Sequence, residues 1–186
     1  MIEKQIYTIG HGTRKTNEFI NLLKHYGIHY LIDVRSQPYS KFNPHFNQND
    51  LRFALENRGI KYVFMGDELG GRPADISCYD EEGRVDYKKV KEKDFFIAGI
   101  NRLMTACEKG IPVGIMCSET KPGECHRSKL IGRVLSEENI VLKHIDERGR
   151  IKSQSDVINE LNKGLSDQSL FPDQINASHT SRKSYM

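Results

Sequence analysis

The stretch PVGIMCSETKPGECHRSKLIGRVL, residues 112–135, decides how the rest of the chain is interpreted. Residues 113–116 form an apolar run that ends on a cysteine, and a polar loop with a Pro-Gly pair follows. Cys125-His126-Arg127 then begins an amphipathic helical pattern. Open α/β folds bind ligands where a strand leads through a polar loop to a helix N-terminus, because free N–H groups and the helix dipole attract anions there. The stretch therefore predicts an α/β fold with a ligand site.

The alternation of strands and helices repeats on both sides of that stretch. Helical patterns that end on glycine or on polar residues separate the apolar runs. Strands separated by helices predict a mostly parallel sheet covered on both faces. The right-handed crossover rule then favours a Rossmann-like three-layer sandwich with a five-stranded sheet. The expected strands are residues 5–10, 30–34, 61–65, 112–117 and 140–145, and the expected helices are 16–27, 51–57, 94–109, 126–137 and 155–165.

The length of 186 residues is typical of one domain. We expect residues 1–165 to form a single α/β domain with a long polar loop at about 66–91, a length typical of lids and binding loops. Residues 166–186 are rich in Ser, Asn and Gln, which predicts a flexible polar tail. Within this tail, residues 167–171 resemble the short Gln-plus-Leu-Phe peptides with which bacterial DNA proteins bind the sliding clamp, although the glutamine stands one position too close to the Leu-Phe pair.

Composition indicates the cellular compartment and the kinds of partner to expect. Four cysteines without a pairable framework, and no apolar N-terminal segment, are typical of a reducing, cytoplasmic protein. We expect no membrane partner, because no apolar run is long enough for a membrane helix. The net charge of +3 permits nucleic acid as a partner without requiring it. The sequence does not define the oligomeric state.

Polar side chains follow the predicted strands at the edge where their carboxyl ends meet. A histidine between two glycines can act as a base or as an anion ligand. An arginine at a strand end suits bidentate binding of phosphate or carboxylate, although a structural ion pair with a neighbouring aspartate is an equal alternative. A Gly-Gly-Arg loop can wrap an anion or be a plain turn. These residues are His11, Asp33, Arg35, Ser36, Gly70, Gly71, Arg72, Cys117, Glu119, Cys125, His126 and Arg127.

Cys117 and Cys125 permit several interpretations. The first is a cysteine nucleophile, as in phosphatases and rhodaneses, but Glu119 and Glu124 would repel the anion that such a loop binds. The second is a zinc site with His126 and His11, although the usual Cys-x2-4-Cys spacing is missing. In the third, which we favour, the two glutamates bind hydroxyl groups, as of a ribose, and arginines hold a phosphate. The fourth is a pair of buried structural cysteines.

Aromatic residues in the region 39–53 alternate with basic ones. Tyr39, Phe42, Phe46 and Phe53 are interleaved with Lys41, His45 and Arg52. Bases stack on aromatic rings while cations bind phosphates, so this pattern predicts a base platform. A half-buried loop has the same composition.

Four motifs taken together resemble the bacterial and archaeal family labelled domain of unknown function 488. They are TIGHGT (residues 8–13), LIDVRSQPYS (31–40), LGGRP (69–73) and CSETKPGECHR (117–127), and the resemblance covers residues 5–145. It implies a Rossmann-like three-layer domain whose motif residues line one pocket. The family has no settled activity, and a link to DNA metabolism or modification is the association that the resemblance implies.

These expectations combine into one functional hypothesis with two alternatives. We expect an enzyme that acts on a phosphate-bearing substrate derived from a nucleotide or nucleic acid. One alternative is a non-catalytic module that binds a nucleotide or nucleic acid, and the other is a zinc-dependent hydrolase. The catalytic candidates are His11, Cys117, Glu119, Cys125 and His126, and the anion-binding candidates are Asp33, Arg35, Ser36, Gly70, Gly71, Arg72 and Arg127.

Overall fold

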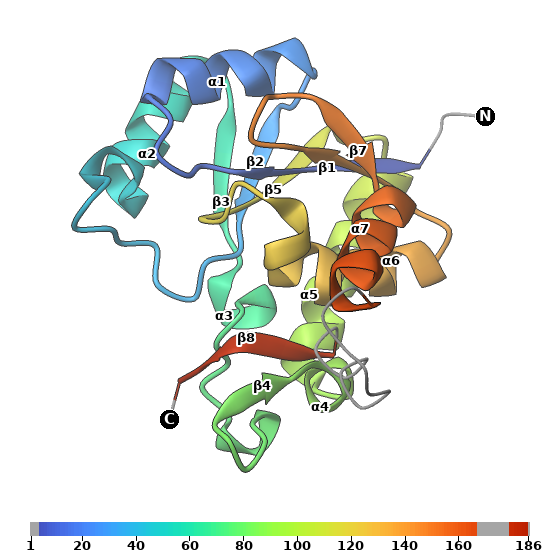
Figure 1. The fold of residues 1–186 in the computed structure, drawn as a ribbon. Coiled ribbons are helices and arrows are strands. Elements are labelled where there is room, and N and C mark those ends of the chain that lie inside the picture. Colours follow the sequence, from blue (N-terminus) through green and yellow to red (C-terminus); the bar gives the residue numbers. More distant parts are fainter. Residues whose placement is uncertain (1–3, 167–178, 186) are drawn as a thin grey trace.

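A six-stranded sheet, parallel except at one edge, forms the centre of the molecule (Figure 1). The computed structural model describes residues 4–166 and 179–185. The strands of this sheet are β1 (Gln5–Gly10), β2 (Tyr30–Asp33), β3 (Lys61–Phe64), β5 (Val113–Cys117), β6 (Val141–Ile145) and β7 (Ile151–Ser153). They are arranged in the order β3-β2-β5-β1-β6-β7.

Helices cover both faces of the sheet, which confirms the predicted α/β, Rossmann-like sandwich. Helices α1 (Thr16–His25) and α2 (Gln48–Glu56) bury apolar side chains such as Phe19 and Leu51 against one face. Helices α5 (Asp94–Glu108), α6 (Arg133–Glu137) and α7 (Gln154–Ser166) lie on the other side in Figure 1. No helix in the described ranges has the length and the apolar character required to cross a membrane.

The strand count differs from the expected five because of β7. This strand has only three residues, Ile-Lys-Ser, and pairs antiparallel with β6 through a tight turn. Gly149 in that turn has a φ of +77°, a conformation that favours glycine. A strand so short and so polar has no apolar run that would predict it from the sequence.

The segment 66–91, expected to be a long loop, contains short elements. They are α3 (Gly66–Leu69), a 3-10 helix (Ile76–Cys78), β4 (Arg84–Asp86) and α4 (Tyr87–Lys91). The expected tail also differs, because β8 (Thr180–Ser184) pairs antiparallel with β4, as Figure 1 shows. The Val85 N–H donates to Ser181 Oγ at 2.9 Å, and the Tyr87 N–H donates to the carbonyl of His179 at 2.9 Å. The clamp-like residues 167–171 lie outside the described residues.

The register of the sheet brings the carboxyl ends of β1, β2 and β5 together. Gly10 is aligned with Cys117, and Asp33 with Met116. Beyond the strands, the His11 N–H still donates to the Cys117 carbonyl at 3.0 Å. A Cβ at Gly10 would lie 1.8 Å from the Glu119 carbonyl oxygen, so only glycine allows the loop after β5 to pass this closely.

Candidate functional site

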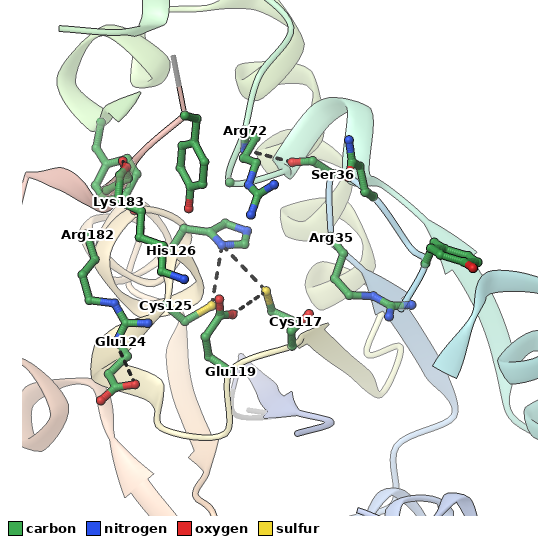
Figure 2. A pocket seen from close by; sticks show the side chains of 17 residues that line it. Arg35, Ser36, Arg72, Cys117, Glu119, Glu124, Cys125, His126, Arg182 and Lys183 are labelled. Carbon is green, nitrogen blue, oxygen red and sulfur yellow. Dashed lines mark hydrogen bonds and ion pairs between the residues drawn. The ribbon is translucent and has the colours of Figure 1, made fainter. Parts of the chain in front are cut away.

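A polar pocket of about 240 Å³ opens at this edge of the sheet (Figure 2). Water occupies about 30 Å³ per molecule, so the pocket has room for a phosphate group and part of what carries it. Its lining comes from the ends of β2 and β5, from the loop of residues 70–72 after α3, from the start of the helical segment after residue 124, and from β8. We call residues 70–72 the Gly-rich loop. These segments are far apart in the sequence, and the fold joins them.

Two cysteines and a histidine form a buried cluster beside the pocket. Cys117 is the last residue of β5, and Cys125 and His126 precede a π-helical segment, Arg127–Gly132. Nδ1 of His126 lies 3.6 Å from Sγ of Cys125 and 3.9 Å from Sγ of Cys117. The Cys117 thiol donates to Oε2 of Glu119 at 3.0 Å, as the dashed lines of Figure 2 show. We call Cys117, Cys125 and His126 the sulfur–imidazole cluster.

The two sulfur atoms differ in their affinity for a proton. Contact with Cys125 and burial together raise the pKa of Cys117 well above its usual value. Burial alone would also raise the pKa of Cys125, but the Cys117 thiol and the charges of His126 and Arg127 outweigh it and hold that pKa well below its usual value. Burial lowers the pKa of His126, and the neighbouring Cys125 thiolate overcomes this and raises it. These directions favour the thiolate form of Cys125, the imidazolium form of His126 and a proton on Cys117.

Arg127 supports the cluster from behind and does not line the pocket. Its guanidinium is fully buried and donates to the Glu119 carbonyl at 2.5 Å and to Thr8 Oγ1 at 3.5 Å. Its backbone N–H points to Sγ of Cys125 at 3.5 Å. The sequence predicted that Arg127 binds a phosphate directly. The structure instead places Arg127 next to the Cys125 sulfur and outside the pocket lining.

Arg35 lines the pocket, but its charge is already neutralised. Both Arg35 and Asp33 are buried, and Nη2 of Arg35 lies 2.6 Å from Oδ2 of Asp33. The Tyr62 hydroxyl donates to the same carboxylate at 2.7 Å, and Arg35 also donates to the Phe46 carbonyl at 2.8 Å. The alternative of a structural ion pair therefore describes Arg35 best.

His11 lies behind Arg35 and outside the pocket lining. Its Nδ1–H donates to the Gly12 carbonyl at 2.9 Å, and Nε2 lies 3.3 Å from Nη1 of Arg35. The ring stacks on Phe46 with centroids 4.3 Å apart. Burial lowers the pKa of His11 to about 4, so the ring is neutral at pH 7. With both nitrogens engaged, His11 positions Arg35 and does not face the pocket.

The Gly-rich loop packs directly on the cluster. A Cβ at Gly71 would lie 2.8 Å from Nδ1 of His126, so the loop reaches the ring only because this residue is glycine. A Cβ at Gly70 would lie 2.4 Å from Oγ of Ser36, which accepts the Arg72 N–H at 2.9 Å. Gly70 itself does not line the pocket, whereas Ser36, Gly71 and Arg72 do.

The C-terminal strand supplies cations that the sequence did not predict as site residues. Arg182 and Lys183 of β8 line the pocket, and Arg182 pairs with Glu124 at 3.0 Å. The Arg72 guanidinium lies 4.2 Å over the ring of Tyr185. Within the described part of the chain, neither Arg72 nor Lys183 has a carboxylate at ion-pair distance. The basic composition of the C-terminal residues was the only sequence signal for this contribution.

The structure thus divides the candidate residues into two groups. Arg35, Ser36, Gly71, Arg72, Cys117, Glu119, Cys125 and His126 line one pocket. Asp33, His11, Gly70 and Arg127 lie behind it and hold the lining residues in place. The arrangement combines cations on the rim with sulfur, imidazole and carboxylate groups that can transfer protons or bind a metal.

Comparison with known proteins identifies one family. The model of the family described as Domain of unknown function DUF488 matches residues 15–134. This range includes the Gly-rich loop and the whole sulfur–imidazole cluster, while β8 lies beyond it. No curated protein matches the chain.

Proposed function

The chain belongs to the family described as Domain of unknown function DUF488, and we propose that it is an enzyme acting on a phosphate-bearing substrate derived from a nucleotide or nucleic acid. One observation carries the proposal. Arg72 and Lys183 have no carboxylate partner in the described ranges, and they line the same pocket as the buried sulfur–imidazole cluster and Glu119. Cations above a group of proton-transferring side chains are the arrangement that phosphate chemistry requires.

The charges on the pocket lining favour an anion. Arg35 is neutralised by Asp33, and Arg182 by Glu124. Arg72 and Lys183 then remain against the single carboxylate of Glu119. An arginine offers a planar fork for two phosphate oxygens, and a lysine offers a point charge. A phosphate group on this rim would pair with both.

His126, which lines the pocket, has a buried ring nitrogen without a protein partner. Nε2 of His126 is inaccessible to solvent and has no hydrogen-bond partner among the described residues. A buried donor left unpaired costs about 1–3 kcal/mol. Because this atom is closed to solvent, a phosphate oxygen would accept its N–H and remove that cost only after a shift of the His126 ring towards the pocket.

The surroundings of the pocket favour a nucleotide as the carrier of the phosphate. Tyr39 lines the pocket with 71% of its surface exposed, and Phe42 in the same loop is 90% exposed. Exposed aromatic rings next to cations are typical of sites where bases stack. Glu119 and Glu124 lie on the same lining and can accept hydrogen bonds from ribose hydroxyl groups.

Within this proposal Glu119 is the catalytic proton acceptor. Its carboxylate lies at the pocket surface beside the cluster, where an attacking hydroxyl or water molecule would stand. Proton transfer by a positioned side chain contributes roughly 100- to 10,000-fold to a rate. Replacing Glu119 with glutamine should lower kcat by a factor in that range and leave the fold unchanged.

The test is turnover of a defined substrate panel by the full chain. Nucleoside mono-, di- and triphosphates and short oligonucleotides are incubated with wild type, Glu119→Gln and Glu137→Gln, and products are identified by mass spectrometry. Glu137 is an exposed residue of α6 that pairs with Lys91, so its replacement should leave kcat unchanged. Lack of product from every member of the panel would overturn the enzymatic role. Binding without product would favour the non-catalytic module.

A further inference from the structure

We infer that Cys117, Cys125 and His126 hold a zinc ion, and that its fourth coordination position opens into the pocket. These three residues place one ligand atom each within 4.8 Å of the others, and all three are buried. A set of two thiolates and one imidazole suits zinc rather than magnesium or calcium, which prefer oxygen ligands. The site deepens the proposed function by adding a metal to the same pocket.

The distances between the ligand atoms match those around a tetrahedral zinc ion. Zn–S bonds of about 2.3 Å and Zn–N bonds of about 2.0 Å, at tetrahedral angles, place nitrogen and sulfur about 3.6 Å apart. Nδ1 of His126 lies 3.6 Å from one sulfur and 3.9 Å from the other. An ion would fit between these atoms with shifts of a few tenths of an ångström.

The elements that carry the ligands hold them rigidly. Cys117 ends a fully buried central strand, and the other two ligands stand at the start of a buried helical segment. The Gly71 backbone packs on the His126 ring, and the Arg127 N–H approaches the Cys125 sulfur. A site on such elements is already formed before the metal arrives, which favours tight binding.

The electrostatics of the cluster support a dication. Two thiolates this close together repel each other when no cation lies between them. A zinc ion between them would stabilise both thiolates. Because zinc is bound by deprotonated sulfur and neutral imidazole, binding would release protons to solvent.

The fourth position faces the pocket that Glu119 and the cations share. Three protein ligands and one open position are typical of catalytic zinc, whereas structural zinc is closed by four protein ligands. An open position here would accept a phosphate oxygen or a water molecule, with the Glu119 carboxylate beside it. This use of the open position rests on the proposed function, but the zinc site itself does not.

Metal content of the intact protein tests the inference. The full chain is purified without chelator, and zinc is counted by native mass spectrometry and by elemental analysis. We expect one zinc ion per chain in wild type and a loss of at least tenfold in occupancy in Cys117→Ser and Cys125→Ser. Cys107→Ser is the matched control, because Cys107 is a buried cysteine of α5 outside the pocket, and it should retain the full zinc content.

A second measurement on wild type avoids any dependence on folding of the variants. Cobalt(II) added to metal-depleted protein should give thiolate-to-metal charge-transfer absorption and the visible bands of tetrahedral coordination. Wild type that binds neither zinc nor cobalt in this way would overturn the site. A mass lower by the two hydrogens of a Cys117–Cys125 disulfide, with no metal uptake after reduction, would also overturn it.

The outcomes separate this inference from the proposed function. Zinc without turnover of any phosphate-bearing substrate would leave the metal site and overturn the enzymatic role. Turnover by protein that contains and requires no zinc would support the enzymatic role and overturn the metal site.

Discussion

Arg127 brings a positive charge into the interior, and no described carboxylate forms an ion pair with it. Nε of its guanidinium has no partner among the described residues, while the other nitrogens hold the loop after β5 and Thr8. A buried cation of this kind requires a nearby negative charge. The Cys125 sulfur is the group next to it that can supply one, so Arg127 and the sulfur–imidazole cluster depend on each other.

Arg127→Met therefore tests the support behind the site. Methionine is similar in length but donates no hydrogen bond and carries no charge. In chelator-treated protein, we expect the free energy of unfolding to fall by about 2–3 kcal/mol, the magnitude for lost hydrogen bonds from a charged donor. Urea denaturation measures the change. Arg58→Met, at an exposed residue, should change it by less than about 0.5 kcal/mol, and an equal loss in both variants would contradict this account of Arg127.

His144 predicts part of the pH dependence of stability. It is buried, accepts from the Thr8 hydroxyl at 2.7 Å and donates to Gln154 at 2.6 Å, and burial lowers its pKa to about 4 from 6.5. Because the unfolded state binds the proton more readily, the stabilising contribution is complete above pH 6.5 and is lost as the pH falls towards 4. The full loss is about 3 kcal/mol.

The variant His144→Asn isolates that contribution. Asparagine does not titrate, so the stability of the variant should fall less steeply than that of wild type between pH 6.5 and pH 4. Urea unfolding at several pH values gives both slopes. Parallel slopes would show that His144 does not contribute.

The Gly-rich loop acts on the cluster through one close contact. In Gly71→Ala the new methyl group would stand 2.8 Å from Nδ1 of His126, so the ring has to leave its present position beside the two sulfur atoms. Disturbing the surroundings of a metal ligand lowers metal affinity roughly 10- to 100-fold. We expect a loss of that size in the zinc affinity of Gly71→Ala. Competition with a chromophoric chelator measures it. Gly123→Ala is the control, because its nearest contact would be an ordinary 3.8 Å.

Strand β8 contributes charge to a site that is otherwise built from the main sheet. Lys183→Met removes one rim cation and keeps the strand. We expect the affinity for adenosine 5′-monophosphate, measured by calorimetry, to fall about tenfold and to become less sensitive to salt. Lys88→Met, at an exposed residue of α4 outside the pocket lining, should bind like wild type. Unchanged affinity in Lys183→Met would remove β8 from the binding site.

The sequence predicts those parts of the fold whose signal is local. The core strands are continuous apolar runs because both faces of a parallel sheet are buried, and the glycines at 27 and 59 mark helix ends. Strand β8 pairs with a segment more than ninety residues away, at Val85 and Ser181, and its residues are mostly polar. Hydrophobic periodicity carries no information about such a partner, so the sequence predicted a tail there.

In the candidate site, too, the sequence predicts what depends on local signals and misses what depends on distant pairing. Cys117, Cys125 and His126 could be predicted together because a strand end and the next helix start are joined by a short loop. The sequence did not determine the direction of Arg127 and His11, because that depends on burial and on partners from other elements. Arg182 and Lys183 reach the pocket only through the pairing of β8 with β4.

In the proposed function, one pocket, formed by the edge of the main sheet and by β8, binds the phosphate of a nucleotide. The most direct test is an amide proton–nitrogen correlation spectrum of the labelled full chain during titration with adenosine 5′-monophosphate. We expect saturable shifts at Arg72, Ser118, Glu119 and Lys183, which line the pocket. Shifts confined to the groove between α1 and the turn at Arg148, or no saturable shift at millimolar nucleotide, would contradict it.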